Sequence, residues 1–460
     1  MPAPESRRRS GRRILAVAAA FLVVAVVSIA VSLIVTPERT VTAFGQTVAV
    51  GVAPPSLSTR GPGQLVLFGQ TIPTEVTFLG PIRPRLVLTT INIDEQVAAS
   101  FSPGPHAPIA ATLGAKLVAG WRAYFFVEIA FVAVIAFVLL GAIAGWRRFG
   151  GKTTMLFILV GVLIAELLNL GAIGVAAVTA QARLRDVQSL QQLVGQPADA
   201  PVPAAPGPAL PQIEAVVLGD STAAGVGGPL VPDPTKRDTL CGRSSFAFSS
   251  TLARVNEWDV ENLACGGASI RQGILGSQTL QGTQIPPQLA AAKRAVDAST
   301  VIVAVGANDL GWSSFLRLCA VVDTCNNRAI DAYFQRSLET FTRSYLELLR
   351  QLSTLPGDPQ IVIVQYYIPF DPAQDCLADA GLTKDKTATL IDRLQSLNTV
   401  LATGAQTFGY ASATPDFSGH ELCTEQPYVQ GLTEPAPLHP NARGQLLIAL
   451  AIERAILGSG

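Results

Sequence analysis

Three long apolar runs dominate the first half of the chain. The segments 14–35, 123–145 and 154–180 carry at most one charged residue each. Each approaches or exceeds the about 20 residues that a helix needs to cross a bilayer, whereas a buried helix of a soluble domain would be shorter or show a polar face. The first run is also longer than the about 7–15 apolar residues of a cleaved signal peptide. We therefore expect three transmembrane helices, the first of them an uncleaved anchor.

Basic residues beside these runs predict the orientation of the helices. The tail at 1–13 contains five arginines, and the short turn at 146–153 contains three basic residues. Because Lys and Arg collect on the cytoplasmic side of a membrane, we expect both segments to be cytoplasmic. The segment 36–122 and everything after about residue 181 should then lie outside the cytoplasmic membrane.

Shorter patterns fill the outer segments. Within 36–122, β-like runs at 40–52, 64–68, 75–78 and 85–93 alternate with Pro- and Gly-rich turns, which predicts a small extracytoplasmic β-rich domain. No catalytic constellation is visible in this segment.

A second outer domain is predicted at 212–460, after a Pro/Ala-rich linker at 181–211. In this domain short β-branched runs alternate with longer helical patterns, which indicates a mainly parallel sheet covered by helices. The predicted strands are 213–218, 300–305 and 360–365, and the predicted helices are 329–352, 384–405 and 442–456.

Polar residues inside the apolar runs need an explanation. Glu128 lies toward the outer end of the second run, and Glu166 and Asn169 lie deep in the third. An ionisable group at the centre of a bilayer costs about 2.5 kcal/mol or more, so it is a functional candidate. We favour a packing role, in which a protonated glutamate hydrogen-bonds a neighbouring helix; packing between subunits is the alternative.

Charge and cysteine content restrict the function of the outer domain. The chain has 33 basic and 33 acidic residues among its 460, so no general electrostatic attraction to nucleic acid is expected. All six cysteines lie after residue 240, without a CxxC pair, which favours three disulfides in an oxidising compartment over thiols that bind metal.

Four short motifs in the outer domain carry candidate chemistry. A G-D-S-T turn at 219–222 follows the first strand and can project a serine hydroxyl, and a Gly-containing stretch occupies 262–268. Gly306-Ala307-Asn308-Asp309 follows a later strand, and His439-Pro440-Asn441 precedes the last helix. Each motif alone is weak, but their order along a parallel-sheet pattern is informative.

In these motifs the sequence resembles the SGNH/GDSL hydrolase family, over about residues 212–458. The resemblance implies a three-layer α/β domain with a parallel sheet, and a carboxylic ester hydrolase that uses no cofactor and no metal. It makes Ser221 the nucleophile and His439 the general base. The oxyanion hole would combine the backbone N–H groups of Ser221 and Gly267 with the Asn308 side chain. Gly266 remains an alternative donor.

One position departs from the family pattern. Where the family often has an Asp three residues before the His, this chain has Ala436. Either a backbone carbonyl at Ala436 or Pro437, or the carboxylate of Glu434, would then orient His439. We prefer the carbonyl, which fixes the imidazole tautomer but stabilises the imidazolium less than a carboxylate does.

The cysteines strengthen a narrower likeness to actinobacterial secreted SGNH lipases and esterases. That likeness implies the pairs Cys241–Cys265, Cys319–Cys325 and Cys376–Cys423, although the sequence alone leaves fifteen pairings open. It also makes His420 structural or pocket-lining rather than the base. Asp220 and Asp309 are interpreted as residues that fix turns and loops, with a metal pair as the alternative.

These observations together predict a multi-pass membrane protein with a cytoplasmic N-terminus and an extracytoplasmic serine ester hydrolase. Its expected partners are the lipid bilayer, an ester substrate on a lipid or a cell-envelope glycan, and envelope proteins. Two rival functions stay open. One is a glycan O-deacetylase or acyltransferase with the same serine chemistry, and the other is a non-catalytic ester-binding or scaffolding protein.

Overall fold

The structure is a computed structural model that describes residues 4–43, 46–56, 58–91, 107–184, 207–210, 212–373 and 375–458. It divides into two compact units. The first unit holds most of the described residues up to Leu184, and the second holds those from Gly207 onward. Most of the expected linker at 181–211 therefore lies outside the described residues.

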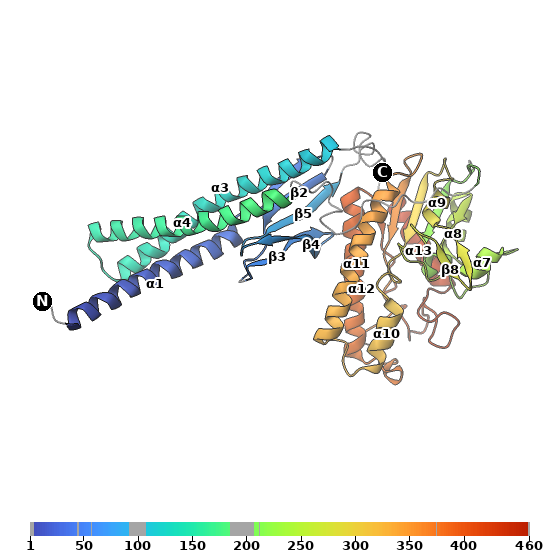
Figure 1. The fold of residues 1–460 in the computed structure, drawn as a ribbon. Coiled ribbons are helices and arrows are strands. Elements are labelled where there is room, and N and C mark those ends of the chain that lie inside the picture. Colours follow the sequence, from blue (N-terminus) through green and yellow to red (C-terminus); the bar gives the residue numbers. More distant parts are fainter. Residues whose placement is uncertain are drawn as a thin grey trace. The chain divides into compact units, whose positions relative to one another are not determined.

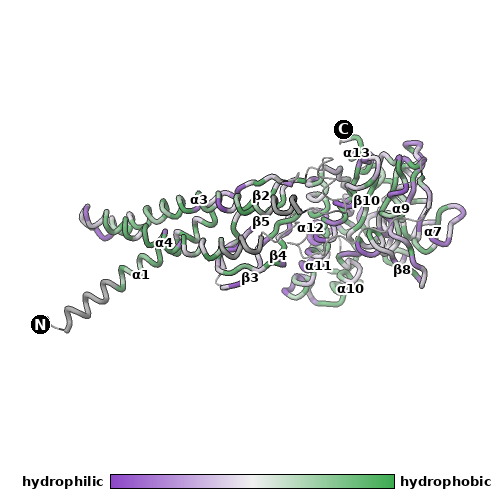
Figure 2. The backbone as a smooth tube through the Cα atoms, turned by 45° about the horizontal axis from the view of Figure 1, so that its top comes forward, coloured by the Kyte–Doolittle hydropathy of each residue, from purple (hydrophilic) through white to green (hydrophobic). Residues whose placement is uncertain are grey.

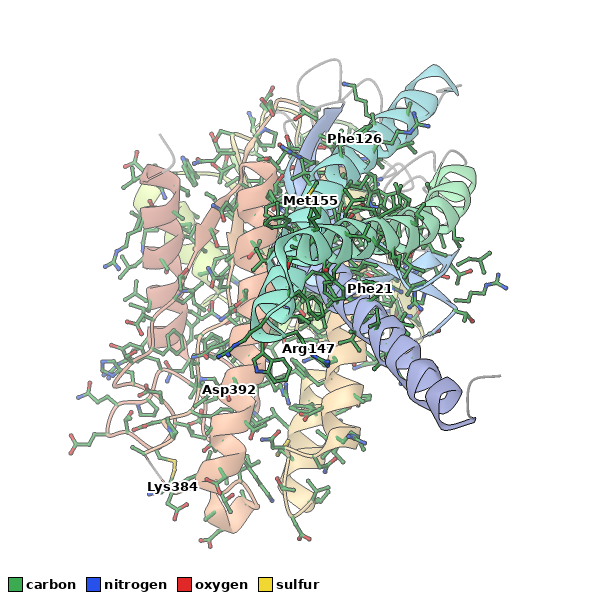
Figure 3. The ribbon with its side chains drawn as sticks, turned by 90° about the vertical axis from the view of Figure 1, so that its left-hand side faces the viewer. Phe21, Phe126, Arg147, Met155, Lys384 and Asp392 are labelled. Carbon is green, nitrogen blue, oxygen red and sulfur yellow. A yellow bond between two sulfur atoms is a disulfide. The ribbon has the colours of Figure 1, made fainter. Side chains whose placement is uncertain are left out.

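Three long helices form the body of the first unit (Figure 1): α1 (Pro4–Val35), α3 (Ala107–Trp146) and α4 (Gly151–Leu184). They are apolar along most of their length (Figure 2). Side chains such as Phe126 and Met155 face outward (Figure 3) and are 76% and 72% exposed, so apolar side chains lie on the outside of the bundle as well as inside it. Three stretches of the described residues are long and apolar enough to cross a membrane: Leu15–Val35, Ala115–Trp146 and Gly151–Ala177.

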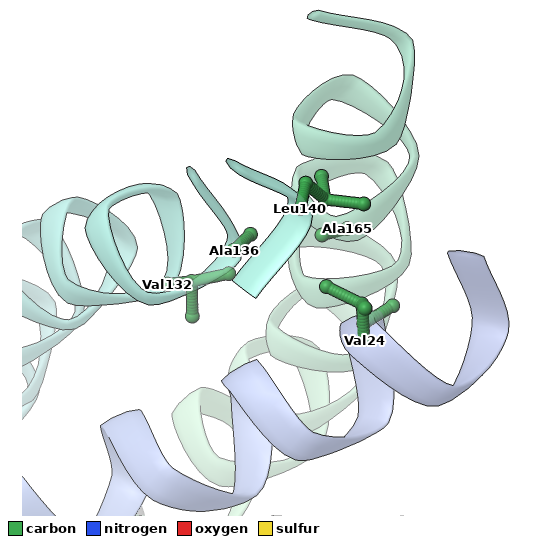
Figure 4. Close-up of a cluster of buried hydrophobic side chains, with 6 residues drawn as sticks. Val24, Val132, Ala136, Leu140 and Ala165 are labelled. Atoms are coloured by element: carbon green, nitrogen blue, oxygen red, sulfur yellow. The ribbon is translucent and has the colours of Figure 1, made fainter. Parts of the chain in front are cut away.

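Small and branched side chains fill the centre of this bundle (Figure 4). The buried cluster consists of Val24, Ala25, Val132, Ala136, Leu140 and Ala165. Gly161 of α4 leaves room for side chains of the other two helices, because a β-carbon there would lie 2.5 Å from Leu140 Cδ1 and 2.9 Å from Phe21 Cε1. Small residues at helix interfaces allow such close packing in membranes.

Glu128 is fully buried in the same bundle and is hydrogen-bonded to both neighbouring helices. Its Oε1 accepts from Ser32 Oγ at 2.5 Å, and its Oε2 accepts from Asn169 Nδ2 at 2.9 Å. The two carboxyl oxygens of Glu166 are buried and have no hydrogen-bond partner within the described part of the chain. Glu128 thus ties α1, α3 and α4 together through its side chain.

The expected β-rich region is a five-stranded sheet with the order β1-β2-β5-β3-β4. Its strands are β1 (Arg39–Ala43), β2 (Gln46–Val52), β3 (Arg60–Leu67), β4 (Gln70–Leu79) and β5 (Pro84–Ile91). Helix α3 starts at Ala107, inside the stretch that the sequence analysis gave to this region, and packs on β1 and β2. Lys116 Nζ donates to Thr42 O at 2.9 Å, so the first part of α3 is hydrogen-bonded to the sheet.

The second unit contains the predicted parallel sheet, with the order β12-β11-β10-β6-β7. Its strands are β6 (Ala215–Gly219), β7 (Val260–Asn262), β10 (Thr300–Ala304), β11 (Gln360–Val364) and β12 (Ala411–Ala413). Every residue of β6 and β10 is buried, as expected for continuous apolar runs in a sheet covered on both faces.

Helices cover this sheet on both sides (Figure 1) and complete the three-layer α/β domain. Helices α8 (Phe248–Asn256) and α13 (Ala442–Leu457) pack together, as do α11 (Arg328–Leu352) and α12 (Lys384–Phe408). The remaining elements are short: α6 (Ser221–Ala224), α7 (Lys236–Cys241), β8 (Gln278–Leu280), β9 (Thr283–Ile285), α9 (Gln288–Ala292), α10 (Trp312–Val321) and a 3-10 turn at Ala378–Ala380.

Strand β6 lies at the point where the order of the sheet reverses. The chain passes from β6 to β7 on one side, and the next strand of the sheet, β10, pairs with β6 on the other side. In open parallel sheets, ligands bind beside the carboxyl ends of the strands at such a switch point. The residues that follow Gly219 therefore occupy the position in this domain that favours a site.

The packing of Leu140 and Phe21 against Gly161 can be tested by Gly161→Val. We expect the added side chain to overpack the bundle and to lower its stability by about 1–3 kcal/mol. Gly171→Val on the same helix is the matched control, because no atom lies within 4 Å of a β-carbon built there. Unfolding of the detergent-solubilised protein measures the effect, and equal losses in the two variants would contradict the packing described.

Candidate active site

Ser221 lies at a sharp turn between strand and helix. Strand β6 ends at Gly219, Asp220 caps the short helix α6, and Ser221 is its first residue. A β-carbon at Gly219 would lie 2.5 Å from Ala304 O of the paired strand β10, so only glycine fits at this position. The Asp220 carboxylate accepts a hydrogen bond from Thr222 N at 2.9 Å, which fixes the turn. Ser221 is thus held, half-buried, at the switch point of the sheet.

His439 faces this serine from a loop 218 residues later in the chain. Its Nε2 atom lies 2.8 Å from Ser221 Oγ, and its Nδ1 atom lies 3.2 Å from Pro437 O. The carbonyl can only accept, so Nδ1 carries the ring hydrogen and Nε2 is left as the acceptor for the serine hydroxyl. A serine and a histidine in this relation have the geometry that a nucleophile and its general base require.

The loop before α13 is held in place by backbone hydrogen bonds. Gln430 N donates to His439 O at 2.7 Å, and Leu438 N donates to Gln430 O at 2.9 Å. Leu438 itself has a φ of 66°, and its carbonyl accepts from Tyr367 Oη at 2.8 Å. Gln430 also reaches the serine side, because its Nε2 donates to Val226 O at 3.0 Å. This buried glutamine joins the loops that carry His439 and Ser221.

The candidates for orienting His439 are separated by this geometry. Pro437 O faces Nδ1, whereas Ala436 O accepts from His439 N at 3.1 Å. Glu434 is exposed, and no hydrogen bond joins it to His439 among the described residues. The preferred backbone carbonyl therefore lies at Pro437.

The Gly-containing motif packs directly against the end of β6. Cys265 N donates to Gly219 O at 3.1 Å, and Gly266 N donates to Cys241 O at 2.9 Å. Gly267 follows with a φ of 78°, a conformation that favours glycine. Within the part of the chain that the structure describes, the N–H groups of Gly267 and Ser221 have no acceptor. Of the two glycines, Gly267 is therefore the one with a donor to spare.

Asn308 joins the third motif to the second. Its Nδ2 donates to Ala268 O at 2.9 Å, which leaves the second hydrogen of the amide nitrogen for another acceptor. The neighbouring Asp309 carboxylate accepts from Ile270 N, with distances of 3.0 and 3.2 Å to its two oxygens. Asp309 thus fixes the loop beside Asn308, as the sequence analysis predicts.

Tyr366 is a site residue that sequence reasoning missed. Its hydroxyl donates to Asp220 Oδ2 at 2.5 Å and accepts from Ala307 N at 3.0 Å, so it links the first and third motifs. Burial raises the pKa of Asp220, while the Tyr366 hydroxyl and the Thr222 N–H oppose that rise. The oxygens of Asp220 are bonded to protein donors, and no group of three or more potential metal ligands occurs among the described residues.

His420 occupies a structural position away from the serine contact. Its Nδ1 lies 2.9 Å from Gln426 O, and its ring stacks on Tyr428 with centroids 3.8 Å apart. The six cysteines form the disulfides that the resemblance implies: Cys241–Cys265, Cys319–Cys325 and Cys376–Cys423. The first of them braces the loop that carries Gly266 and Gly267.

The Asp309 carboxyl should make stability depend on pH. Burial, followed by the charge of Asp220, raises its pKa from an ordinary value of 3.8 to about 7, against the hydrogen bond from Ile270. The folded state then binds this proton more tightly than the unfolded state does. The resulting stabilisation is complete below about pH 4 and is lost as the pH rises to about 7.

Asp309→Asn removes this titration and keeps an acceptor for Ile270 N. We expect the thermal midpoint of the wild type, relative to that of the variant, to fall between about pH 4 and pH 7. Midpoints measured across this range test the sign, and parallel curves for the two proteins would contradict it.

The chain is similar to known proteins over this same domain. Residues 217–447 match the GDSL-like Lipase/Acylhydrolase family. A lipase of Streptomyces rimosus is 27% identical over 249 residues, which cover 51% of this chain and 84% of the relative. Lipase 1 of Streptomyces coelicolor is 27% identical over 244 residues, which cover 50% of this chain and 81% of that lipase.

Among solved structures, the extracellular lipase of Streptomyces rimosus aligns with a TM-score of 0.44 and 21% identity, over 53% of this chain and 99% of that one. The phospholipase A1 of Streptomyces albidoflavus aligns with a TM-score of 0.40 and 21% identity, over 52% of this chain and 98% of that one. The family match spans half of the chain and includes all four motifs of the site. The chain therefore belongs to the GDSL-like lipase/acylhydrolase family of carboxylic ester hydrolases.

Proposed function

We propose that this protein is a membrane-anchored serine ester hydrolase whose active site lies outside the cytoplasmic membrane. The observation that carries the proposal is the 2.8 Å contact between His439 Nε2 and Ser221 Oγ. A serine hydroxyl is a poor nucleophile until a neighbouring base takes its proton, and in this proposal His439 is that base.

The proposed reaction has two steps. Ser221 Oγ attacks the acyl carbon of the ester while His439 Nε2 takes the hydroxyl proton, and the alcohol then leaves with that proton as the acyl-enzyme forms. In the second step His439 takes a proton from water as the water oxygen attacks the acyl carbon; the bond from that carbon to Ser221 Oγ then breaks, His439 returns the proton to Oγ, and the carboxylic acid leaves. No cofactor enters either step.

The oxyanion of each tetrahedral intermediate would be bound by three donors. These are the N–H groups of Ser221 and Gly267 and the second hydrogen of Asn308 Nδ2. The first two have no acceptor among the described residues, and Asn308 is held by its bond to Ala268 O. Donors already held in place cost no reorganisation when the charge develops, and each contributes about 3 kcal/mol.

The membrane orientation rests on charge and on the disulfides. Five arginines precede the apolar stretch Leu15–Val35 of α1, and three basic residues lie in or beside the short connection between α3 and α4. Cytoplasmic placement of both clusters puts the three disulfides in a compartment where they persist. Three membrane crossings then hold the hydrolase domain at the outer surface, where acyl esters of lipids and envelope glycans are concentrated.

A cavity of ≈ 640 Å³ lies between the segment after α6 and the start of α13, and its lining includes Gly225, Phe246 and Arg443. Neither Ser221 nor His439 lines this cavity, so it does not select the substrate. The same serine chemistry acts on an ester of a sugar as on an ester of a lipid. O-deacetylation of a glycan, or acyl transfer to one, is the second candidate function.

Single substitutions test the proposed roles. We expect Ser221→Ala and His439→Ala in the full-length protein in detergent to lower kcat on short p-nitrophenyl esters by at least about 10⁴-fold, with folding retained. His420→Ala is the matched control and should keep most of the activity, because its ring packs on Tyr428. Equal turnover by the wild type and Ser221→Ala would remove Ser221 from its role.

A further inference from the structure

Gln278, the first residue of β8, is bonded to the loop that would form the oxyanion hole. Its Nε2 donates to Gly266 O at 2.9 Å, and a β-carbon built on Gly267 would lie 3.5 Å from the same nitrogen. The side chain is only 7% exposed, and its Oε1 has no hydrogen-bond partner within the described part of the chain. The hydrolytic mechanism proposed above does not use this residue.

The carbonyl that Gln278 binds shares a peptide unit with the N–H of Gly267. A trans peptide is planar, so the C=O of Gly266 and the N–H of Gly267 lie in one rigid plane and point in opposite directions. A donor that holds the carbonyl on one side therefore sets the direction of the N–H on the other. Gln278 binds the carbonyl of this peptide, and the N–H on its opposite side is the group that would face the oxyanion.

The peptide between Gly266 and Gly267 needs such a restraint. Glycine reaches positive and negative φ with similar ease, so rotation of this peptide plane meets little steric resistance. The neighbouring bonds, from Gly266 N to Cys241 O and from Ala268 N to Cys265 O, hold the peptides on either side of it. The bond from Gln278 is the one hydrogen bond to Gly266 O among the described residues.

The cost of burying Gln278 supports a specific use. A buried amide oxygen without a donor is unfavourable, and an apolar side chain of similar size would avoid that cost if position 278 served only packing. The residue opposite Gln278 in the β8–β9 pair, Ile285, packs in a cluster with both cysteines of the first disulfide. This packing fixes the β8–β9 hairpin and so holds the backbone of Gln278 in place.

We propose that Gln278 is a positioning residue that directs the Gly267 N–H into the oxyanion hole by holding the Gly266 carbonyl. The inference rests on the proposed serine hydrolase function and adds a requirement to it. Without the Gln278 donor, the Gly266–Gly267 peptide can rotate. This rotation removes one oxyanion donor without altering Ser221 or His439. The effect should fall on kcat, because the charge that this donor stabilises exists only in the transition state.

Gln278→Leu and Gln278→Glu, made in the full-length protein, test the proposal. We expect Gln278→Leu to lower kcat for p-nitrophenyl esters by on the order of 10- to 100-fold with little change in KM, since removal of a whole oxyanion donor costs about 10²–10³-fold. Thermal unfolding of each variant verifies that it is folded.

Gln278→Glu supplies a readout that a merely structural role would not move. An ionised glutamate cannot donate to Gly266 O, whereas a protonated one can. The ratio of variant to wild-type kcat should therefore rise as the pH is lowered, while the shared titration of the catalytic base cancels in the ratio. Thr279→Glu places the same charge on the adjacent exposed residue, and its ratio should stay flat.

The possible outcomes distinguish failure of the positioning role from failure of the proposed hydrolase function. A wild type that depends on Ser221, together with a Gln278→Leu variant of unchanged kcat or a pH-independent Gln278→Glu ratio, would overturn the positioning role alone. Turnover that does not depend on Ser221 would overturn the proposed function and the inference with it. If Gln278→Leu fails to fold, the pH-dependent ratio of Gln278→Glu decides.

Discussion

The site depends on one hydrogen bond between parts of the chain that are 218 residues apart, from Ser221 Oγ to His439 Nε2. A loop can close such a distance only if other bonds hold it, because a 2.8 Å contact between two side chains is too weak to order a loop by itself. Here the restraint comes from the backbone. Gln430 exchanges hydrogen bonds with His439 and Leu438, and its side chain reaches Val226 on the serine side. The hydrogen bonds of Gln430 therefore hold the two loops in the positions that bring Ser221 and His439 into contact.

The carboxylates of Asp220 and Asp309 accept hydrogen bonds that fix the surrounding turns and loops, and neither is hydrogen-bonded to His439. Asp220 caps α6 and accepts from Tyr366, and Asp309 holds the backbone at Ile270. His439 receives a neutral carbonyl, Pro437 O, at the position where an aspartate would stabilise its positive charge. The carbonyl still selects the tautomer that leaves Nε2 as the acceptor for the serine hydroxyl. The proposed base therefore keeps its geometry without a carboxylate hydrogen-bonded to its ring among the described residues.

Much of the fold and the outline of the site were readable from the sequence, for physical reasons. Continuous apolar runs predicted β6, β10 and β11 because strands covered on both faces bury every residue. The three apolar helices, and the helices α11, α12 and α13, followed from length and periodicity. The edge strands β7 and β12 have three residues each, too few for a pattern. The start of α3 at Ala107 was missed because Lys116 and Arg122 interrupt the apolar pattern ahead of residue 123.

The choice between Gly266 and Gly267 needed the structure, because only the bond from Gly266 N to Cys241 O shows which donor is already used. Tyr366, Gln430 and Gln278 were missed for a related reason. Their partners include backbone atoms that lie far away in the chain, and no residue pattern reveals such contacts.

The central claim, that His439 activates Ser221 for acyl transfer, can be tested most directly by mass spectrometry of the protein after reaction with a fluorophosphonate. The account predicts one covalent adduct, located on the peptide that contains Ser221, that forms rapidly in the wild type and is lost or greatly slowed in His439→Ala. An adduct on another residue, or equally fast labelling of Ser221 without His439, would contradict it.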